Sequence, residues 1–253
     1  MEEKDNFKVE LEKYSQAIEL NDKDPEPLKK RGNFYIQTER YENALDDYSK
    51  AINLNDKDFS LFANRASIYY ALENYDNALS DYSKAIDIND TSDALFFLRG
   101  RTYNSLKQFE CGLDDLNNAI VINNKSFLLF AFRGDINSNL KNYKNALDDY
   151  SKAIALDDKN VALYNSRART YTFLENYENA LNDYTKAIEL NDKDYLLFAL
   201  RGRSYYILEE FENALNDYSK AIDINNQIFL NYKFRGKTYE NLYIKSLIEY
   251  SEE

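Results

Sequence analysis

The chain has 253 residues and a formal net charge of −12, with 30% charged and 15% aromatic residues. This aromatic content can supply a large buried core, which argues against disorder, and the acidic balance argues against nucleic acid as the main partner because phosphate binding needs a basic surface. The sequence contains no His, the commonest general base and metal ligand, so we expect no catalytic residue, no metal site and no cofactor.

The N-terminus reads MEEKDNF and lacks the basic and then apolar run of a secretory signal. No apolar stretch approaches the ~18 residues that a membrane helix needs, so we expect no membrane insertion. The single cysteine, Cys111, allows no internal disulfide and fits a reducing compartment. The expected location is the cytoplasm.

One pattern runs through nearly the whole chain. Arginines recur at 34-residue intervals from Arg31 to Arg235, and the sequence DYSKAI of Asp47–Ile52 recurs in the same register. Repetition at a period of this size indicates stacked supersecondary units. The predicted parts of one solenoid domain are an N-terminal half repeat at 1–24, six repeats at 25–58, 59–92, 93–126, 127–160, 161–194 and 195–228, and a partial seventh repeat or C-terminal cap at 229–253.

Each repeat carries two stripes of mostly apolar residues at helical spacing. Counted from 1 to 34 within a repeat, the first stripe occupies positions 4, 7, 8 and 11, and the second occupies positions 17, 20, 21, 24, 27 and 28. The phase breaks between the stripes, so each repeat is predicted to be a helical hairpin. Asn74, Asn142 and Asn176 are expected to cap second helices, and the Asp or Asn at position 32 is expected to cap the next first helix. One hairpin cannot bury its own apolar face, so neighbours must stack into an all-α solenoid.

The repeat resembles the tetratricopeptide repeat (TPR). It has a large apolar residue at position 4, Gly or Ala at 8, and in most repeats Tyr at 11, Ala at 20, Tyr at 24 and Ala at 27. The resemblance implies a right-handed α-solenoid whose first helices line a concave, peptide-binding groove. Two usual features are missing, the Gly in the hairpin turn and the Pro at position 32, which puts the geometry of the turns in question.

An aspartate at position 23 stands at the edge of the second apolar stripe, where a lone charge would cost several kcal/mol. Position 7, on the facing helix, is Arg in every repeat. We therefore expect structural ion pairs across each hairpin; the alternative is that the arginines bind an acidic ligand. The predicted pairs are Arg31 with Asp47, Arg65 with Asp81, Arg99 with Asp115, Arg133 with Asp149, Arg167 with Asp183, and Arg201 with Asp217.

The two ends of the chain depart from this pattern. The segment Phe7–Leu20 matches a second helix that has no first helix before it, with Lys13 at position 23 and Glu10 at position 20, so we interpret 1–24 as a polar cap. In the seventh repeat, Glu249 takes the place of the Asp if two residues are lost from the turn. Within the array, Asn137 in a core position and Gly112 inside a helix predict low local stability.

The groove positions of the first repeats are polar. Lys29, Asn33 and Asn64 resemble the start of the carboxylate clamp with which some TPR co-chaperones hold a C-terminal carboxylate. The clamp also needs basic residues at positions 2 and 6 of the third repeat, where this chain has Ala94 and Leu98. A clamp adaptor therefore remains an alternative function, and solvated surface is the other explanation of these residues.

From the third repeat onward the predicted groove combines apolar and basic residues. The alternative for the apolar ones is packing between neighbouring first helices, above all for Leu98 and Leu200. We expect a non-enzymatic scaffold that binds a protein segment or peptide with apolar and acidic residues, and we consider RNA binding an unfavoured alternative; the oligomeric state stays open. The candidate residues are Phe97, Leu98, Leu128, Phe132, Leu200 and Phe234, with the basic residues Arg101, Arg169, Arg203 and Lys237.

Overall fold

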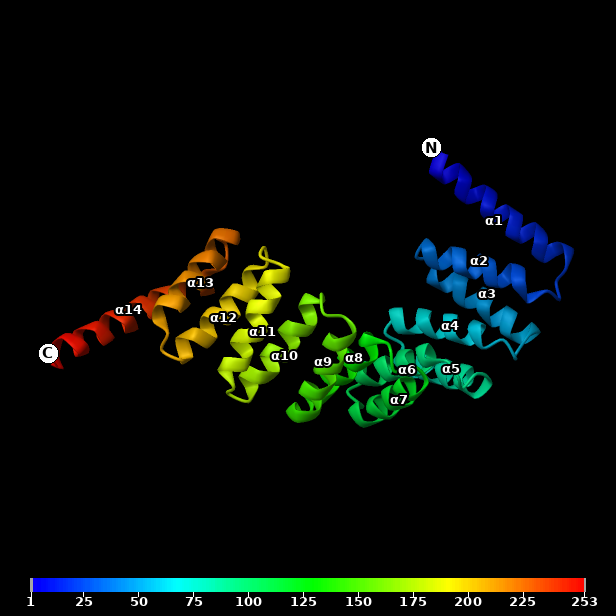
Figure 1. Cartoon of the computed structure of the whole chain (residues 1–253). Coiled ribbons are helices and arrows are strands. Elements are labelled where there is room, and N and C mark those ends of the chain that lie inside the picture. The colour runs from blue at the N-terminus through cyan, green and yellow to red at the C-terminus, as the bar shows by residue number, and fades with distance from the viewer. Residues whose placement is uncertain (1, 253) are drawn as a thin grey trace. The chain divides into compact units, whose positions relative to one another are not determined.

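The computed structural model describes residues 2–252, with side chains described for residues 9–248. This part of the chain is built of fourteen α-helices and contains no strand (Figure 1). The helices are α1 (Glu2–Leu20), α2 (Pro25–Gln37), α3 (Tyr41–Leu54), α4 (Phe59–Ala71), α5 (Tyr75–Ile88), α6 (Asp93–Ser105), α7 (Phe109–Ile122), α8 (Phe127–Asn139), α9 (Tyr143–Leu156), α10 (Val161–Phe173), α11 (Tyr177–Leu190), α12 (Tyr195–Ile207), α13 (Phe211–Ile224) and α14 (Phe229–Glu252).

Each of the six complete repeats is a hairpin of a 13-residue first helix and a 14-residue second helix. The turn between them places position 15 in the left-handed region, with φ between 56° and 61°, although the residue there is Glu or Lys and never Gly. The turn geometry is therefore the same in all six hairpins. Six non-glycine residues adopt a backbone conformation that costs an L-residue about 1–2 kcal/mol.

The caps of the first helices differ from the sequence-based expectation. Position 32 does not cap them; the N-cap is position 34, and its side chain accepts a hydrogen bond from the second residue of the helix at Asp24, Asp58, Asn160 and Asp194. Position 31 has a different role, since its side-chain oxygen accepts from the backbone N–H two residues later, as Asn55 does from Lys57. The second-helix caps lie where expected, but of the three asparagines only Asn176 accepts a backbone hydrogen bond with its side chain.

The core of each hairpin lies between its two helices. The alanines at positions 20 and 27 are fully buried wherever they occur, and the tyrosine ring at position 24 packs against position 8 of the first helix. A Cβ atom built on Gly134 would lie 2.9 Å from the Tyr150 ring, so this position stays small to admit the ring. This packing fixes the distance between the helices and directs the tyrosine hydroxyl toward position 9 of the first helix, as in the hydrogen bond from Tyr150 to Asp135.

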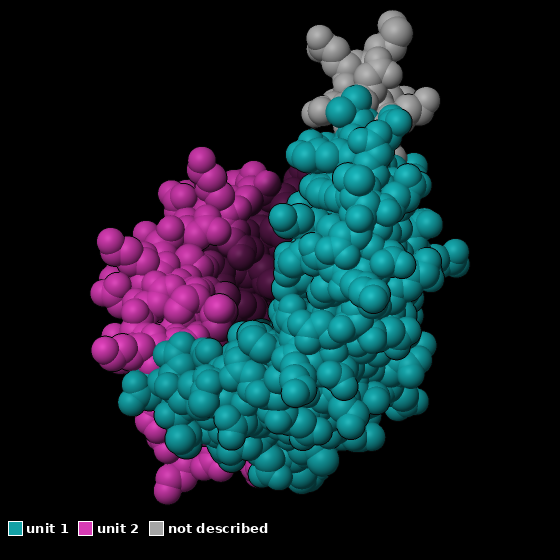
Figure 2. Space-filling view, turned by 90° about the vertical axis from the view of Figure 1, so that its right-hand side faces the viewer, with its two compact units in different colours: residues 1–124 teal, residues 125–253 magenta. Residues whose placement is uncertain are grey.

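The chain forms two compact units, residues 1–124 and 125–253, which are coloured separately in Figure 2. The N-terminal unit holds α1–α7 and the C-terminal unit holds α8–α14. Within each unit, successive helices pack in chain order.

The first and last helices are not parts of hairpins. Helix α1 packs on α2, and Ser15 at position 25 accepts a hydrogen bond from Arg31 Nη1 at 3.0 Å, so α1 stands in the register of a second helix. Helix α14 runs without a turn through the whole predicted seventh repeat. An ion pair between Arg235 and Glu249 within one chain is therefore excluded, because 14 residues of continuous helix separate them by about 21 Å. The Glu249 side chain lies outside the described residues.

Asn137 occupies its core position with a hydrogen-bonded side chain. Asn137 is buried, and its Nδ2 donates to Asp149 Oδ2 at 3.2 Å. The amide thus joins the ion pair of its own hairpin. Its burial carries no penalty for a missing hydrogen bond.

Candidate peptide-binding surface

The conserved charges of the repeat meet inside the hairpins and leave the outer face of the first helices to other residues. In all six complete repeats the position-7 arginine donates from Nε and Nη2 to the two oxygens of the position-23 aspartate, at 2.7–3.0 and 2.6–2.8 Å respectively. The arginine side chains are 15–20% exposed and the aspartates 2–7%. These six arginines hold a carboxylate of their own chain and are not a site for an external acid.

Five of these arginines also link their repeat to the preceding second helix. The Nη1 group donates to a hydroxyl at position 25 of that helix, as Arg65 does to Ser49 at 3.0 Å and Arg201 to Thr185 at 3.1 Å. The hydrogen bonds to aspartate raise the pKa of Arg65 and Arg201 above the ordinary value, against the opposing effect of partial burial. One guanidinium therefore links three helices by hydrogen bonds, as Arg65 of α4 links α3 and α5.

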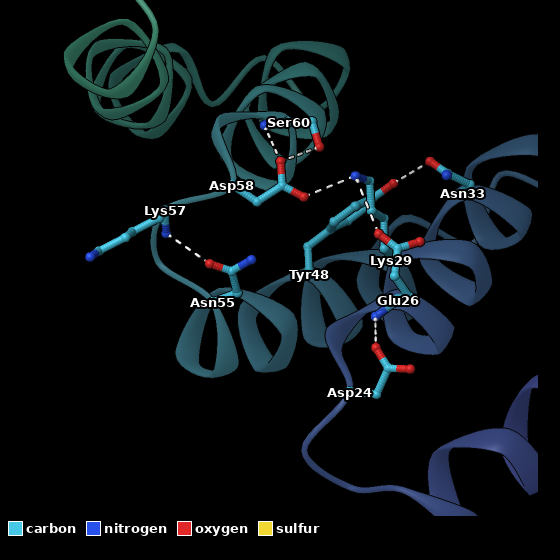
Figure 3. Close-up of polar contacts among 9 residues, drawn as sticks. All are labelled: Asp24, Glu26, Lys29, Asn33, Tyr48, Asn55, Lys57, Asp58 and Ser60. Carbon is cyan, nitrogen blue, oxygen red and sulfur yellow. Dashed lines mark hydrogen bonds and ion pairs between the residues drawn. The ribbon is translucent and has the colours of Figure 1, made fainter.

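In the first two repeats, Lys29 is engaged in an internal network (Figure 3). Its Nζ lies 2.9 Å from Asp58 Oδ2, and the other oxygen of Asp58 accepts from the Ser60 backbone at the start of α4. Partial burial opposes ionisation of Asp58, but the hydrogen bonds from Ser60 and Lys29 outweigh it and hold its pKa below the ordinary value. Lys29 thus forms an ion pair with Asp58, the N-cap residue of α4.

The two asparagines of the suspected clamp are engaged as well. Tyr48 donates from its hydroxyl to Asn33 Oδ1 (Figure 3), and Asn64 is in hydrogen-bonding contact with the same hydroxyl. Burial raises the pKa of Tyr48, so the phenol stays protonated and remains a donor. Lys29 is thus paired within the chain, and positions 2 and 6 of the third repeat are Ala94 and Leu98, so these residues do not favour a carboxylate clamp.

In the third repeat, the predicted groove residues mostly serve packing. Leu98 packs against the buried cluster of Ala66, Ala78 and Tyr82, as the packing alternative expected. The Arg101 guanidinium lies over the Tyr70 ring at 4.2 Å, and the Tyr70 hydroxyl is 3.1 Å from Ser105 Oγ. Phe97 is half-buried on the same helix.

In the C-terminal unit, three first helices present an exposed leucine at position 2. Leu128, Leu196 and Leu230 are 55%, 45% and 51% exposed. Phe132 and Phe234 at position 6 are half-buried, and Phe234 stacks on Tyr218 with ring centroids 5.9 Å apart. The aromatic residues at position 6 are thus partly committed to packing, and the leucines at position 2 are more open to solvent.

A pocket of about 300 Å³ opens between α10 and α12. Arg169 and Arg203, the position-9 residues of repeats 5 and 6, stand on its two sides and are both exposed. Hydroxyl groups and apolar side chains make up the rest of the lining. The lining residues are Arg169, Thr172, Phe173, Tyr177, Tyr184, Leu200, Arg203, Ser204 and Ile207.

The pocket lies where an aromatic contact seen in two other repeats is missing. In repeats 2 and 6 a tyrosine at position 12 lies beside the position-9 cation of the next repeat: the Arg101 guanidinium lies over the Tyr70 ring, and Lys237 Nζ is 5.8 Å from the centre of the Tyr206 ring. In repeat 5 position 12 is Thr172. The smaller side chain leaves space beside Arg203, and sequence inspection missed this residue because its effect depends on the following repeat.

The floor of the pocket includes a neutral phenol. Tyr184 is 1% exposed, and burial raises its pKa to about 12, although contact with Thr172 and the nearby arginines works in the opposite direction. In the next repeat the Tyr218 hydroxyl is buried and no described residue forms a hydrogen bond with it; Arg203 at position 9 supplies no acceptor for its O–H. The arginines thus replace the acceptors that Asn33 and Asp135 supply to tyrosines in repeats 1 and 4.

Family comparisons agree with this repeat geometry. Family models described as "Tetratricopeptide repeat" match residues 60–92, 129–160, 161–194 and 197–228, and one described as "TPR repeat" matches residues 32–73.

The chain belongs to the tetratricopeptide repeat family.

Solved structures of other TPR proteins share the fold. The C-terminal part of a TPR repeat-containing protein from Cytophaga hutchinsonii is 19% identical, with 87% of this chain and 88% of that chain covered and a TM-score of 0.74. A TPR protein from Parabacteroides merdae is 21% identical over 94% of each chain, with a TM-score of 0.64. YrrB, described as a TPR protein with an unusual peptide-binding site, is 25% identical, with 73% of this chain and 94% of its own covered and a TM-score of 0.63. No curated protein matches the sequence.

Among the described residues, no group of three or more acidic or cysteine side chains is placed to hold a metal ion. Within the same part of the chain, every helix is too short or too polar to cross a membrane. The TPR fold is generally a scaffold for protein partners.

Proposed function

We propose that this TPR protein is a non-enzymatic scaffold, located in the cytoplasm, that binds a partner's peptide segment on the first helices of its C-terminal unit. The pocket between α10 and α12 takes an acidic side chain, held between Arg169 and Arg203. Leu196 and Leu200 on α12 take an apolar neighbour of that residue. The observation that carries the proposal is the pair of exposed guanidinium groups on two sides of one pocket.

Arg169 and Arg203 differ from the core arginines in holding no carboxylate by a two-pronged contact among the described residues; burial raises the pKa of Asp135, and the nearby Arg169 acts on that pKa in the opposite direction. Neither forms an ion pair with a described residue, whereas each position-7 arginine of the complete repeats does. A guanidinium presents donors in a planar fork that fits a carboxylate, and two forks can share its oxygens. Thr172 and Ser204 also line the pocket, and their hydroxyls donate to the backbone carbonyls of Arg169 and Leu200, so the two arginines are the donors for a carboxylate there.

The surroundings favour an acid that is followed or preceded by an apolar residue. Phe173 and Ile207 line the pocket, and they are 56% and 43% exposed. Apolar contact contributes affinity, while the charges on an otherwise acidic body contribute orientation and association rate. The likeness to YrrB, a TPR protein described as having an unusual peptide-binding site, supports a peptide as the ligand.

The test uses a displayed library of random short peptides, selected on the wild-type protein. We expect the selected peptides to share an acidic residue next to an apolar one. Their binding should be lost in Thr172→Tyr. A tyrosine at this position would fill the pocket and place its ring under the Arg203 guanidinium, as the Tyr70 ring lies under Arg101. The matched control is Lys220→Glu, a charge reversal at an exposed residue of α13, which should bind as wild type does. Peptides that bind Thr172→Tyr and the double variant Arg169→Glu, Arg203→Glu as well as wild type would place the site elsewhere.

A further inference from the structure

Helix α14 lacks the two residues that make the turn in every complete repeat. Leu242 stands at position 14, where the second to sixth repeats also have Leu, and Tyr243 corresponds to position 17. The missing residues are position 15, which is left-handed in all six turns, and position 16, which is the N-cap of the second helix. Without them the backbone continues as one helix from Phe229 to Glu252.

The sequence after the missing turn is nevertheless that of a second helix. Tyr243–Ser251 reads YIKSLIEYS, and Tyr75–Ser83 of α5 reads YDNALSDYS. Tyr243–Ser251 keeps the residue types of five second-helix positions. These are a small residue at position 20, Leu at 21, an acid at 23, Tyr at 24 and Ser at 25. The first half of α14 likewise keeps the residues of a first helix that receive a second helix, namely Tyr232, Arg235, Gly236 and Tyr239 at positions 4, 7, 8 and 11.

The receiving face of α14 is open. Tyr232 and Tyr239 are 40% and 56% exposed, whereas Phe62 at position 4 of a complete hairpin is 8% exposed. A Cβ on Gly236 would meet nothing within 4 Å, whereas on Gly134 it would meet a tyrosine ring. Arg235 makes no ion pair with a described residue, and its guanidinium carbon lies 5.6 Å from the Tyr232 ring centre.

We propose that the C-terminal helix pairs with the same helix of a second copy of this chain. In this two-fold dimer the segment 243–252 of each copy packs antiparallel on residues 229–241 of the other, and completes there the hairpin that one chain cannot close. Arg235 of one copy then meets Glu249 of the other, as Arg65 meets Asp81 within repeat 2. Shortening a hinge so that an element cannot fold back on its own chain is a known route to such exchange.

The charges of α14 fit the antiparallel arrangement. Residues 229–241 contain three basic residues and one acidic residue, and residues 242–253 contain one basic and three acidic residues. Antiparallel pairing sets the basic half of each helix against the acidic half of the other. The segment is neutral as a whole, so the net charge of −12 does not oppose the contact locally.

The oligomeric state, measured by light scattering and sedimentation, tests the proposal on the full chain. Wild type is expected to be a dimer of twice 29.8 kDa that dissociates on dilution over a roughly hundredfold range. Inserting Glu and Asn between Leu242 and Tyr243, as in the Glu73–Asn74 turn, should give a monomer, because the segment can then fold back on its own chain. Arg235→Glu and Glu249→Arg should each weaken the dimer roughly tenfold, and the two together should restore it.

Two results would overturn the proposal. One is a wild-type chain that stays monomeric over the whole range while circular dichroism shows full helical content. The other is a dimer whose affinity is unchanged by the insertion and by either charge reversal. Peptide binding at the α10–α12 pocket is measured separately, so failure of one proposal leaves the other intact.

Discussion

Arg65 and Asp81 meet across the hairpin of repeat 2 in a two-pronged contact, with Nε 2.7 Å from Oδ2 and Nη2 2.8 Å from Oδ1. The third nitrogen of the same guanidinium reaches Ser49 in the preceding repeat at 3.0 Å. The geometry explains why a carboxylate is kept beside an apolar stripe. It satisfies an arginine that joins two repeats.

Asp81→Ala should lower the free energy of unfolding by roughly 2–4 kcal/mol, because it leaves a mostly buried guanidinium unpaired. Ser49→Ala removes only the link between repeats and should cost about 1 kcal/mol. Chemical denaturation of both variants measures the difference. Equal stability of Asp81→Ala and wild type would show that the pair is a surface contact.

The left-handed turn residues predict a route to higher stability. Glu73 has a φ of 57°, which a glycine adopts without strain. Glu73→Gly removes that strain but also increases the conformational entropy of the unfolded chain, and the net effect should raise the free energy of unfolding by about 0.5–1 kcal/mol. The control is Asn77→Gly on the exposed face of α5, which should lower stability by a similar amount. A melting temperature that falls in both variants would contradict the turn geometry.

The buried tyrosines predict alkaline unfolding. Burial raises the pKa of Tyr184 to about 12, and those of Tyr82 and Tyr218 also rise, whereas the phenols of the unfolded chain titrate near pH 10. A raised folded-state pKa gives stability that is complete below pH 10 and is lost above it, at about 1.4 kcal/mol per pH unit for each such phenol. Tyr184→Phe should reduce that slope between pH 10 and the folded pKa.

Tyr239→Phe, measured on the chain diluted to the monomer, serves as the matched control, because Tyr239 is 56% exposed in a single chain. It should leave the pH slope unchanged. Absorbance of tyrosinate, followed together with helical content, should show the buried phenols ionising only as the chain unfolds. Ionisation of all tyrosines with full helicity retained would refute the burial argument.

Asp58 predicts a loss of stability in acid. Its folded-state pKa is depressed, so its contribution is present above the unfolded pKa, near 4, and is lost as the pH falls through the folded value. At pH 7, Asp58→Asn keeps a capping side chain but loses the charge pairing with Lys29, and should cost about 0.5–1 kcal/mol; Asp58→Ala loses both and should cost about 1–2 kcal/mol. The difference between wild type and Asp58→Asn should vanish in acid, and its persistence would reject the ion pair.

The fold could be predicted from the sequence because the same two apolar stripes recur in every complete repeat. The Arg–Asp pairing could be inferred since two charges at fixed positions recur on facing helices. The first-helix caps were misplaced by two residues, because positions 31, 32 and 34 all carry capping residue types and spacing alone does not separate them. The residues after Leu242 match a second helix, so a shortened turn was expected at a point where α14 continues as one helix.

The candidate site was harder to predict, since it depends on neighbouring repeats. Arg169 and Arg203 were recognised as basic groove residues, but Arg101 occupies the same position and lies over Tyr70. Only the contact between repeats separates a packed arginine from an available one. The deciding residue is Thr172, a small residue at position 12 of repeat 5. Its effect falls on Arg203 in the next repeat, so it could be recognised only by comparing position 12 of one repeat with position 9 of the following one.

The most direct test of the account is a double-mutant cycle between Arg203 and the acidic residue of a peptide selected on the wild-type protein. Calorimetry gives the affinities of wild type and Arg203→Gln for the peptide and for its variant with Glu changed to Gln. If the carboxylate sits in the α10–α12 pocket, the two changes should couple by about 1–3 kcal/mol. Strictly additive effects of the two changes would contradict the placement of the acid between Arg169 and Arg203.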